Sequence, residues 1–303
     1  MIALFKSVPG KSVVPAFFAF LLAVPFSGTH AQISPQPNRQ LASSSVRPML
    51  LITREPNVLF PELLGNCGEA IPYMEDFVQR RRDYLIRMYT RGKKWLPKAA
   101  SVLSKYKLPS ELRVLLTLES AYQGGVVSRA GAVGFWQIMD EVAREYGMKY
   151  VPHFSEEERK KLMKENPRAA DSLFKALIQQ KDDRKNFLKA TTVAARYLRD
   201  RRVNLNDNWL LVVASYNCGV GNVWKALQKS GKPNGSFWDI RAYLPEETQA
   251  YVMNFITLNV VFSNFEKFLS NQLRLRSEEI WVPDNFEQHF SDEQESSGGG
   301  SLR

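Results

Sequence analysis

Apolar residues recur every three or four positions along most of the central chain, which is the spacing of one helix face. The pattern predicts helices over residues 73–88, 95–106, 108–122, 187–202, 209–216, 222–230 and 246–269. No sustained alternation of apolar and polar residues competes with this spacing. The sequence therefore predicts a mainly α fold.

The first 31 residues have the pattern of a secretory signal peptide. Lys6 and Lys11 precede an apolar run from Val13 to Phe26, and short side chains lead to a cleavage site after Ala31. A transmembrane helix needs about 20 apolar residues, and this run is shorter and contains two prolines. We expect export to the periplasm, with association with the envelope membrane, or an uncleaved anchor, left open.

The rest of the chain divides into three parts. Residues 32–68 are rich in Pro, Ser, Asn and Gln and are expected to form a flexible linker. A helical catalytic domain is expected over 69–270, with a charged insertion at 151–180, followed by a C-terminal extension and polar tail over 271–303. The insertion carries apolar residues at helical spacing, so we expect one or two short helices, broken near Asn166 and Pro167, that pack beside the substrate groove.

The charge balance points to an anionic partner. The 303 residues hold 41 Lys and Arg against 31 Asp and Glu, a net charge of +10. An exported protein meets a cell-surface polyanion rather than nucleic acid. With two cysteines and three histidines, the chain offers few ligands for a zinc site, so no metal and no cofactor are expected. Cys67 and Cys218 are expected to be unpaired thiols.

Glu119 is the strongest candidate for catalysis. Leu112, Leu115 and Leu116 lie seven, four and three residues before it, which places the carboxyl group on the apolar stripe of its own helix. It also lies near the C-terminus of that helix, where the helix dipole disfavours negative charge. Both effects raise the pKa of a carboxyl group, as a general acid near neutral pH requires. A structural glutamate at the rim of the stripe is the alternative.

Two later segments combine small residues with aromatic and amide side chains. Residues 128–137 hold Gly131 and Gly134 beside Phe135, Trp136 and Gln137, and residues 214–222 place Tyr and Asn before a glycine-rich turn. Small residues let the backbone approach a ligand, and aromatic faces suit sugar rings.

In their order and spacing these segments resemble the family 1 lytic transglycosylases, the soluble-lytic-transglycosylase type with a goose-type lysozyme-like helical fold. The family motifs correspond to Glu119-Ser120, Ser128, Gly134-Phe135-Trp136-Gln137, Ser215-Tyr216-Asn217 and Tyr251. The resemblance covers about residues 70–265 and is closest to the membrane-bound transglycosylase D subgroup, although no LysM repeat is recognised.

The resemblance implies cleavage of the bond between N-acetylmuramic acid and N-acetylglucosamine in peptidoglycan glycan strands, without water, to leave 1,6-anhydromuramic acid ends. It implies Glu119 as the catalytic residue. The implied substrate-binding residues are Ser120, Ser128, Gln137, Tyr216, Asn217 and Tyr251.

Two other functions stay open from the sequence. A goose-type lysozyme, which is a hydrolase, would share Glu119 and the fold, and a non-catalytic glycan-binding protein would share the aromatic residues and glycines. Most glycosidases use two carboxyl groups, and within the matched motifs only Glu119 qualifies. Asp140 and Glu141 follow the second motif and are expected in the next helix, exposed to solvent. Partners in the cell envelope are not identified by the sequence.

Overall fold

The computed structural model describes residues 49–64 and 68–283. The signal peptide predicted for 1–31, Cys67 and the polar tail after residue 290 lie outside the described residues. In the described part, the chain divides into a helical unit, Leu59–Leu269, and a second unit made of residues 49–58 and 270–283.

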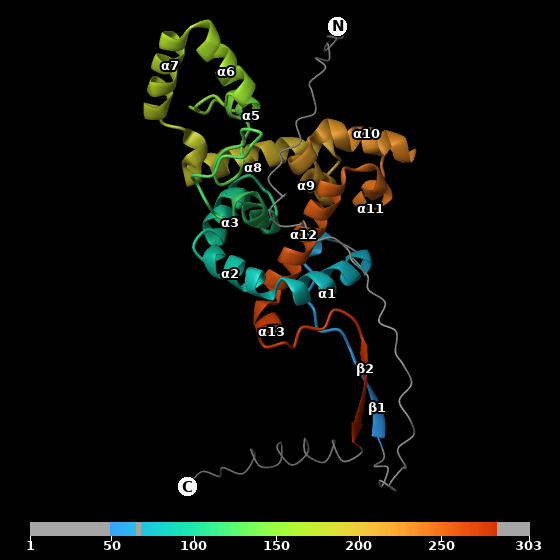
Figure 1. The fold of residues 1–303 in the computed structure, drawn as a ribbon. Helices are drawn as coiled ribbons and strands as arrows, with labels where there is room; N and C mark the ends of the chain where they lie inside the picture. The colour runs from blue at the N-terminus through green and yellow to red at the C-terminus, as the bar shows by residue number, and fades with distance from the viewer. Residues whose placement is uncertain (1–48, 65–67, 284–303) are drawn as a thin grey trace, which may run out of the picture. The chain divides into compact units, whose positions relative to one another are not determined.

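The helical unit confirms the mainly α prediction (Figure 1). Its α-helices are α1 (Ile71–Arg80), α2 (Arg82–Gly92), α3 (Leu96–Lys105), α4 (Leu115–Ser120), α5 (Asp140–Glu145), α6 (Glu156–Glu165), α7 (Pro167–Gln179), α8 (Phe187–Asn204), α9 (Trp209–Cys218), α10 (Val220–Ser230), α11 (Phe237–Ile240), α12 (Glu246–Ser263) and α13 (Phe265–Leu269). Short 3-10 helices cover Glu62–Leu64, Gly68–Ala70, Ser110–Val114, Asp183–Lys185 and Arg241–Tyr243.

Two helices, α9 and α12, form the centre of the core. In α9 every residue from Leu210 to Ser215 is buried, and in α12 every residue from Tyr251 to Val261 is buried. A helix that is apolar on all faces must be surrounded by protein. These two helices therefore hold fixed positions, and both carry residues of the candidate site at their ends.

The second unit is a two-stranded antiparallel sheet. Strand β1 (Met49–Arg54) pairs with β2 (Glu278–Pro283), with Met49 opposite Pro283 and Arg54 opposite Glu278. Within this unit, the Arg274 backbone N–H donates to the Asn57 side chain at 2.9 Å. A strand therefore replaces the flexible linker predicted for this part of 32–68, and its partner lies in the predicted C-terminal extension. The sequence analysis missed both strands because each is short and pairs across more than 200 residues.

The charged insertion forms two helices, as predicted. Helix α6 begins at a capping box in which Ser155 and Glu158 bond each other's backbone N–H, and Asn166 separates α6 from α7. The two helices form a hairpin that projects away from α8 (Figure 1). The described residues that line the pocket around Glu119 come from elements other than α6 and α7.

A buried arginine holds the loop between α4 and α5 in place. The Arg184 side chain is fully buried and donates to the Asp182 carboxylate at 2.7 Å and to the Ile138 carbonyl at 3.3 Å. Its backbone carbonyl lies against Gly134, where a Cβ atom would come within 2.1 Å of the Arg184 oxygen. The left-handed φ of +80° at Gly134 also excludes an ordinary side chain.

Replacement of Gly134 by alanine tests this packing. We expect Gly134→Ala to lower the free energy of unfolding by more than about 1 kcal/mol, because both the φ angle and the Arg184 carbonyl oppose a Cβ. Gly125→Ala is the matched control, since a Cβ there meets nothing within 4 Å. Urea denaturation measures both, and equal stabilities for the two variants would contradict the packing.

Candidate active site

Helix α4 presents Glu119 to a pocket at its C-terminal end. The buried residues Leu112, Leu115 and Leu116 confirm that Glu119 follows an apolar stripe. The helix ends one residue later, because Ala121 adopts a left-handed conformation with φ of 48°. The Glu119 carboxyl group therefore lies at the negative end of the helix dipole.

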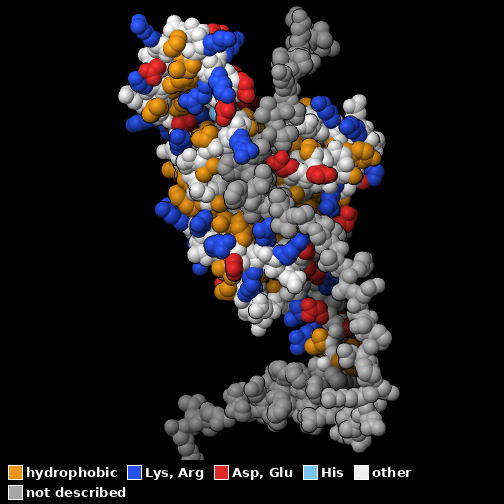
Figure 2. Space-filling model, in the orientation of Figure 1, with side chains coloured by type: hydrophobic (Ala, Val, Ile, Leu, Met, Phe, Trp, Pro, Cys, Tyr) orange, Lys and Arg blue, Asp and Glu red, His pale blue; other side chains and the backbone are white. Residues whose placement is uncertain are grey.

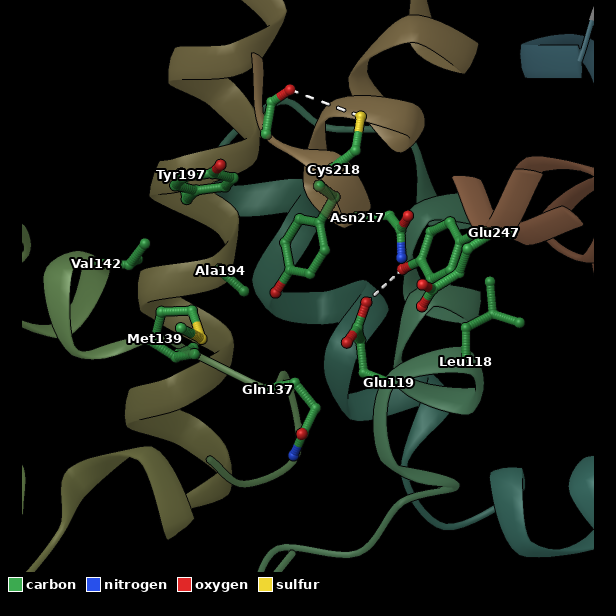
Figure 3. A pocket seen from close by; sticks show the side chains of 14 residues that line it. Leu118, Glu119, Gln137, Met139, Val142, Ala194, Tyr197, Asn217, Cys218 and Glu247 are labelled. Atoms are coloured by element: carbon green, nitrogen blue, oxygen red, sulfur yellow. Dashed lines mark hydrogen bonds between the residues drawn. The ribbon is translucent and has the colours of Figure 1, made fainter. Parts of the chain in front are cut away.

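The pocket has a volume of about 190 Å³ and is built by separate parts of the chain (Figure 3). Its walls come from α4, the loop before α5, α5 itself, α8, α9 and the first turns of α12. Lining residues are Leu118, Glu119, Gln137, Ile138, Met139, Val142, Ala194, Tyr197, Tyr216, Asn217, Cys218, Gly219, Glu247 and Tyr251. Among these described residues none is a lysine, arginine or histidine, so the pocket supplies no cation to a carboxylate.

The pocket raises the pKa of Glu119 from 4.5 to about 8. The main cause is loss of water around the carboxyl group, which disfavours its charged form. The Glu247 carboxyl group adds to the rise, whereas a hydrogen bond from Tyr251 opposes it. Glu119 is therefore largely protonated at neutral pH, which is the form that a general acid needs.

Two tyrosines, Tyr216 and Tyr251, line the pocket together with Glu119. The Tyr251 hydroxyl, from α12, donates a hydrogen bond to Glu119 Oε1 (Figure 3). The Tyr216 hydroxyl, from α9, donates to the Trp136 carbonyl at 2.8 Å and so ties α9 to the loop before α5. Burial raises the pKa of both hydroxyls well above 10, so both remain protonated donors.

Gln137 and Asn217 supply amide groups to the same pocket. Gln137 has a left-handed φ of 45°, and its Nε2 donates to the Gly134 carbonyl at 2.8 Å. Its Oε1 is buried and has no hydrogen-bond partner among the described residues. Asn217 Oδ1 accepts from Thr248 at 2.7 Å, which turns the Asn217 amide nitrogen into the pocket (Figure 3).

Glu247 is a pocket residue that the sequence analysis missed. It lies in the first turn of α12, four residues before Tyr251, so both side chains face the same side of the helix. Burial raises its pKa, and its buried Oε1 has no partner among the described residues. The four-residue spacing to Tyr251 was the available signal in the sequence. The pocket thus holds two carboxyl groups rather than the one expected.

Two predicted substrate-binding residues lie behind the pocket wall. The buried Ser120 hydroxyl donates to the Phe135 carbonyl at 2.8 Å, and the buried Ser128 hydroxyl accepts from the Ala132 N–H at 2.9 Å. Neither lines the pocket. Both hydroxyls therefore support the loop that carries Gln137.

Asp140 also differs from its prediction. It lies at the start of α5, as expected, but its carboxylate pairs with the buried Arg184 guanidinium at 2.5 Å rather than facing only solvent. Asp140 therefore belongs to the arginine network behind the loop. Cys218, in contrast, lies at the pocket as a buried free thiol whose pKa is raised by burial, as expected for an unpaired cysteine.

Comparisons with known proteins agree with this geometry. The family model named Transglycosylase SLT domain matches residues 99–161 and 155–238. The membrane-bound lytic murein transglycosylase D of Escherichia coli, represented by two strains, is 28% identical over 192 residues, which cover 62% of this chain and 36% of the relative. The chain thus matches about a third of the length of these relatives.

A solved structure, an inactive variant of the lytic transglycosylase Slt from Pseudomonas aeruginosa, overlaps with 63% of this chain and 26% of its own. Its identity is 19% and its TM-score 0.37, and no argument rests on it. The two matched segments together contain Glu119, Gln137, Tyr216 and Asn217, and these residues meet in the pocket. Residues 99–238 therefore match the Transglycosylase SLT domain model, and their described structure is mainly helical, as the sequence predicted.

Proposed function

We propose that this chain is a peptidoglycan lytic transglycosylase with Glu119 as its acid and base. The observation that carries the proposal is the Glu119 carboxyl group, which is protonated at neutral pH and bonded by Tyr251 in a pocket lined by no lysine, arginine or histidine. The SLT-domain match and the lytic murein transglycosylase relatives support the same substrate class.

The proposed reaction uses Glu119 twice. Protonated Glu119 donates its proton to the glycosidic oxygen, and the bond from that oxygen to C1 of the muramic acid breaks. The resulting Glu119 carboxylate then takes the proton from the 6-hydroxyl of the same sugar as its oxygen bonds to C1. Glu119 ends protonated, no water is consumed, and the products are a free 4-hydroxyl and a 1,6-anhydro end.

The other pocket residues fit this sequence of steps. The Tyr251 hydroxyl stabilises the Glu119 carboxylate between the two proton transfers, because a hydrogen bond to the charged form favours that form. The Asn217 amide nitrogen is a donor for the oxygen of an acetamido group. Glu247 is placed to stabilise positive charge that develops at C1.

We also propose that the protein acts on the cell wall after export, as the predicted signal peptide and its net positive charge suggest. Its substrate there is the glycan strand. None of the described helices is long and apolar enough to span a membrane. Attachment to a membrane is a property that the name of the relatives states for them.

A goose-type muramidase is the second candidate, and Glu247 favours it. A hydrolase with two carboxyl groups uses the second as nucleophile or base, and Glu247 is the group in the pocket that could serve. Transglycosylase and hydrolase then share Glu119 and differ in what attacks C1.

The products separate the two functions. We expect mass spectrometry of muropeptides released from purified peptidoglycan to find ends lighter by one water, the 1,6-anhydro form. When the digestion is run in ¹⁸O water, the transglycosylase leaves the released ends unlabelled. Reducing ends that carry ¹⁸O would instead identify a hydrolase.

Replacement of the acid tests the role of Glu119. We expect Glu119→Gln to lower the rate of strand cleavage by about 10²–10⁴-fold, because the amide keeps the shape and accepts the Tyr251 hydrogen bond but has no acidic proton. Release of soluble muropeptides measures the rate. Cleavage near the wild-type rate would show that another group is the acid.

The pH dependence of the melting temperature of Glu119→Gln is a further test, and the direction of the change is defined. The pKa of Glu119 is raised in the fold, so the contribution of the protonated carboxyl group to stability is present below pH 4.5 and is lost as the pH rises through about 8. Glu119→Gln does not ionise. We therefore expect it to melt at a higher temperature than the wild type at pH 9, and at nearly the same temperature at pH 4.5.

The pH–rate profile tests the tyrosine. The Tyr251 hydrogen bond lowers the pKa of Glu119, so Tyr251→Phe should move the alkaline limb of kcat/KM up by about 0.5–1 pH unit. Tyr216→Phe is the matched control, because that hydroxyl bonds the Trp136 carbonyl and not Glu119. An equal shift in both variants would refute the specific role of Tyr251.

A further inference from the structure

A second hollow lies between the α6–α7 hairpin and the loops beside it. This hairpin groove, as we call it, has a volume of about 480 Å³, and its lining includes Val127, Phe154, Arg159, Phe174, Ile178 and Lys185. It is separate from the Glu119 pocket, with which it shares no lining residue.

The groove offers apolar surface that the described chain leaves open. Ile178 is 84% exposed and Val127 is 48% exposed. Figure 2 shows hydrophobic side chains gathered on the hairpin, with basic and acidic side chains around them. Covering apolar surface gains about 25 cal/mol per Å², so a ligand with apolar groups would be favoured there.

The aromatic part of the groove is already ordered. The Phe154 and Phe174 rings meet edge to face with centroids 5.7 Å apart, and the Arg159 guanidinium lies 4.7 Å from the centre of the Phe174 ring. This stacking fixes the direction of the Arg159 side chain. A ligand therefore does not have to order these groups when it binds, which lowers the cost of binding.

The charges in the groove have one sign. Arg159 and Lys185 line it, and no carboxyl group is among its described lining residues. Nearby acids are used elsewhere, since Glu158 caps α6 and Asp182 binds Arg184. Cationic and apolar groups side by side select an anionic ligand with small apolar groups.

One loop connects the groove with the catalytic pocket. Gln137 of the pocket donates to the Val126 carbonyl at 3.3 Å, and Val127, the next residue, lines the groove. On the other side, Gly134 packs against the Arg184 carbonyl, and Lys185 follows Arg184 into the groove. The pocket and the groove therefore lie against the same loop.

We propose that the hairpin groove binds the peptide branch of peptidoglycan, an acidic peptide with short apolar side chains carried by the muramic acid. The proposal rests on the proposed function and names its substrate more closely. Arg159 and Lys185 meet the carboxylates of the peptide, and Phe174, Leu177 and Ile178 meet its apolar groups. The groove makes the enzyme prefer strands that still carry peptides.

The test compares two substrates that differ only in the branch. Glycan strands with their peptides and the same strands stripped by an amidase are cleaved by the full-length chain. We expect the wild type to cleave the peptide-bearing strands with a kcat/KM about tenfold higher. The double variant Arg159→Gln/Lys185→Gln should lose that preference through KM while its rate on stripped strands stays unchanged.

A matched control removes the same charge from α6 outside the groove. Lys160 and Lys161 are exposed and do not line the groove, so Lys160→Gln/Lys161→Gln should keep the preference. If both double variants lose it equally, general charge attraction explains the effect and the groove does not. Ile178→Ser, which keeps all charges, should weaken the preference as well.

The outcomes separate the groove from the proposed function. A wild type that cleaves both substrates at equal kcat/KM overturns the groove proposal and leaves the transglycosylase intact. A wild type that cleaves neither overturns the proposed function and the peptide assignment with it. Binding of anionic phospholipid vesicles that depends on Arg159 and Lys185, without any preference for peptide-bearing strands, would assign the groove to a membrane instead.

Discussion

The hydrogen bond from Tyr251 to Glu119 is the contact on which the site depends. It joins α12 to α4 through two residues that are 132 positions apart in the chain. It gives the carboxyl group its only donor within the described pocket. A cation there would hold the carboxylate ionised, and more water would do the same. Burial, the end of α4 and Glu247 instead favour the neutral acid, while Tyr251 limits how far the pKa rises.

This balance requires a rigid frame, which the core and the buried arginine provide. Helices α9 and α12 are buried along most of their length, so Tyr216, Asn217 and Tyr251 have little freedom to move. The loop that carries Gln137 has no helix of its own. Ser120 holds it from one side and Arg184 from the other, and its left-handed residues are tolerated because those contacts surround them.

Local patterns were sufficient to predict most of the helical segments and the inward position of Glu119. The apolar stripe before Glu119 identified its inward position, and the break at Asn166 divided the insertion correctly into α6 and α7. The signals that failed were non-local. Strands β1 and β2 pair across more than 200 residues, and nothing in the sequence near Arg184 indicates that its guanidinium is buried with two carboxylates.

The site residues also divide into those whose position the local motifs predicted and those whose position they did not. Gln137, Tyr216, Asn217 and Tyr251 meet in the pocket that their motifs suggested. Ser120 and Ser128 are turned to the backbone, because a hydroxyl near a loop carbonyl or N–H finds a partner there. The sequence analysis missed Glu247 because it identified the motif at the start of α12 by Tyr251 alone. Both side chains lie on one face of α12.

The ionisation of Glu119 tests the account most directly. Carbon-13 NMR of the glutamate carboxyl groups, followed from pH 3 to 10, reports each titration, and the resonance missing from Glu119→Gln identifies the one that belongs to Glu119. The account predicts a midpoint near 8 for that resonance. A midpoint near 4.5 would mean that the carboxyl group is ionised at neutral pH, and the burial of Glu119 could not then explain its role as an acid.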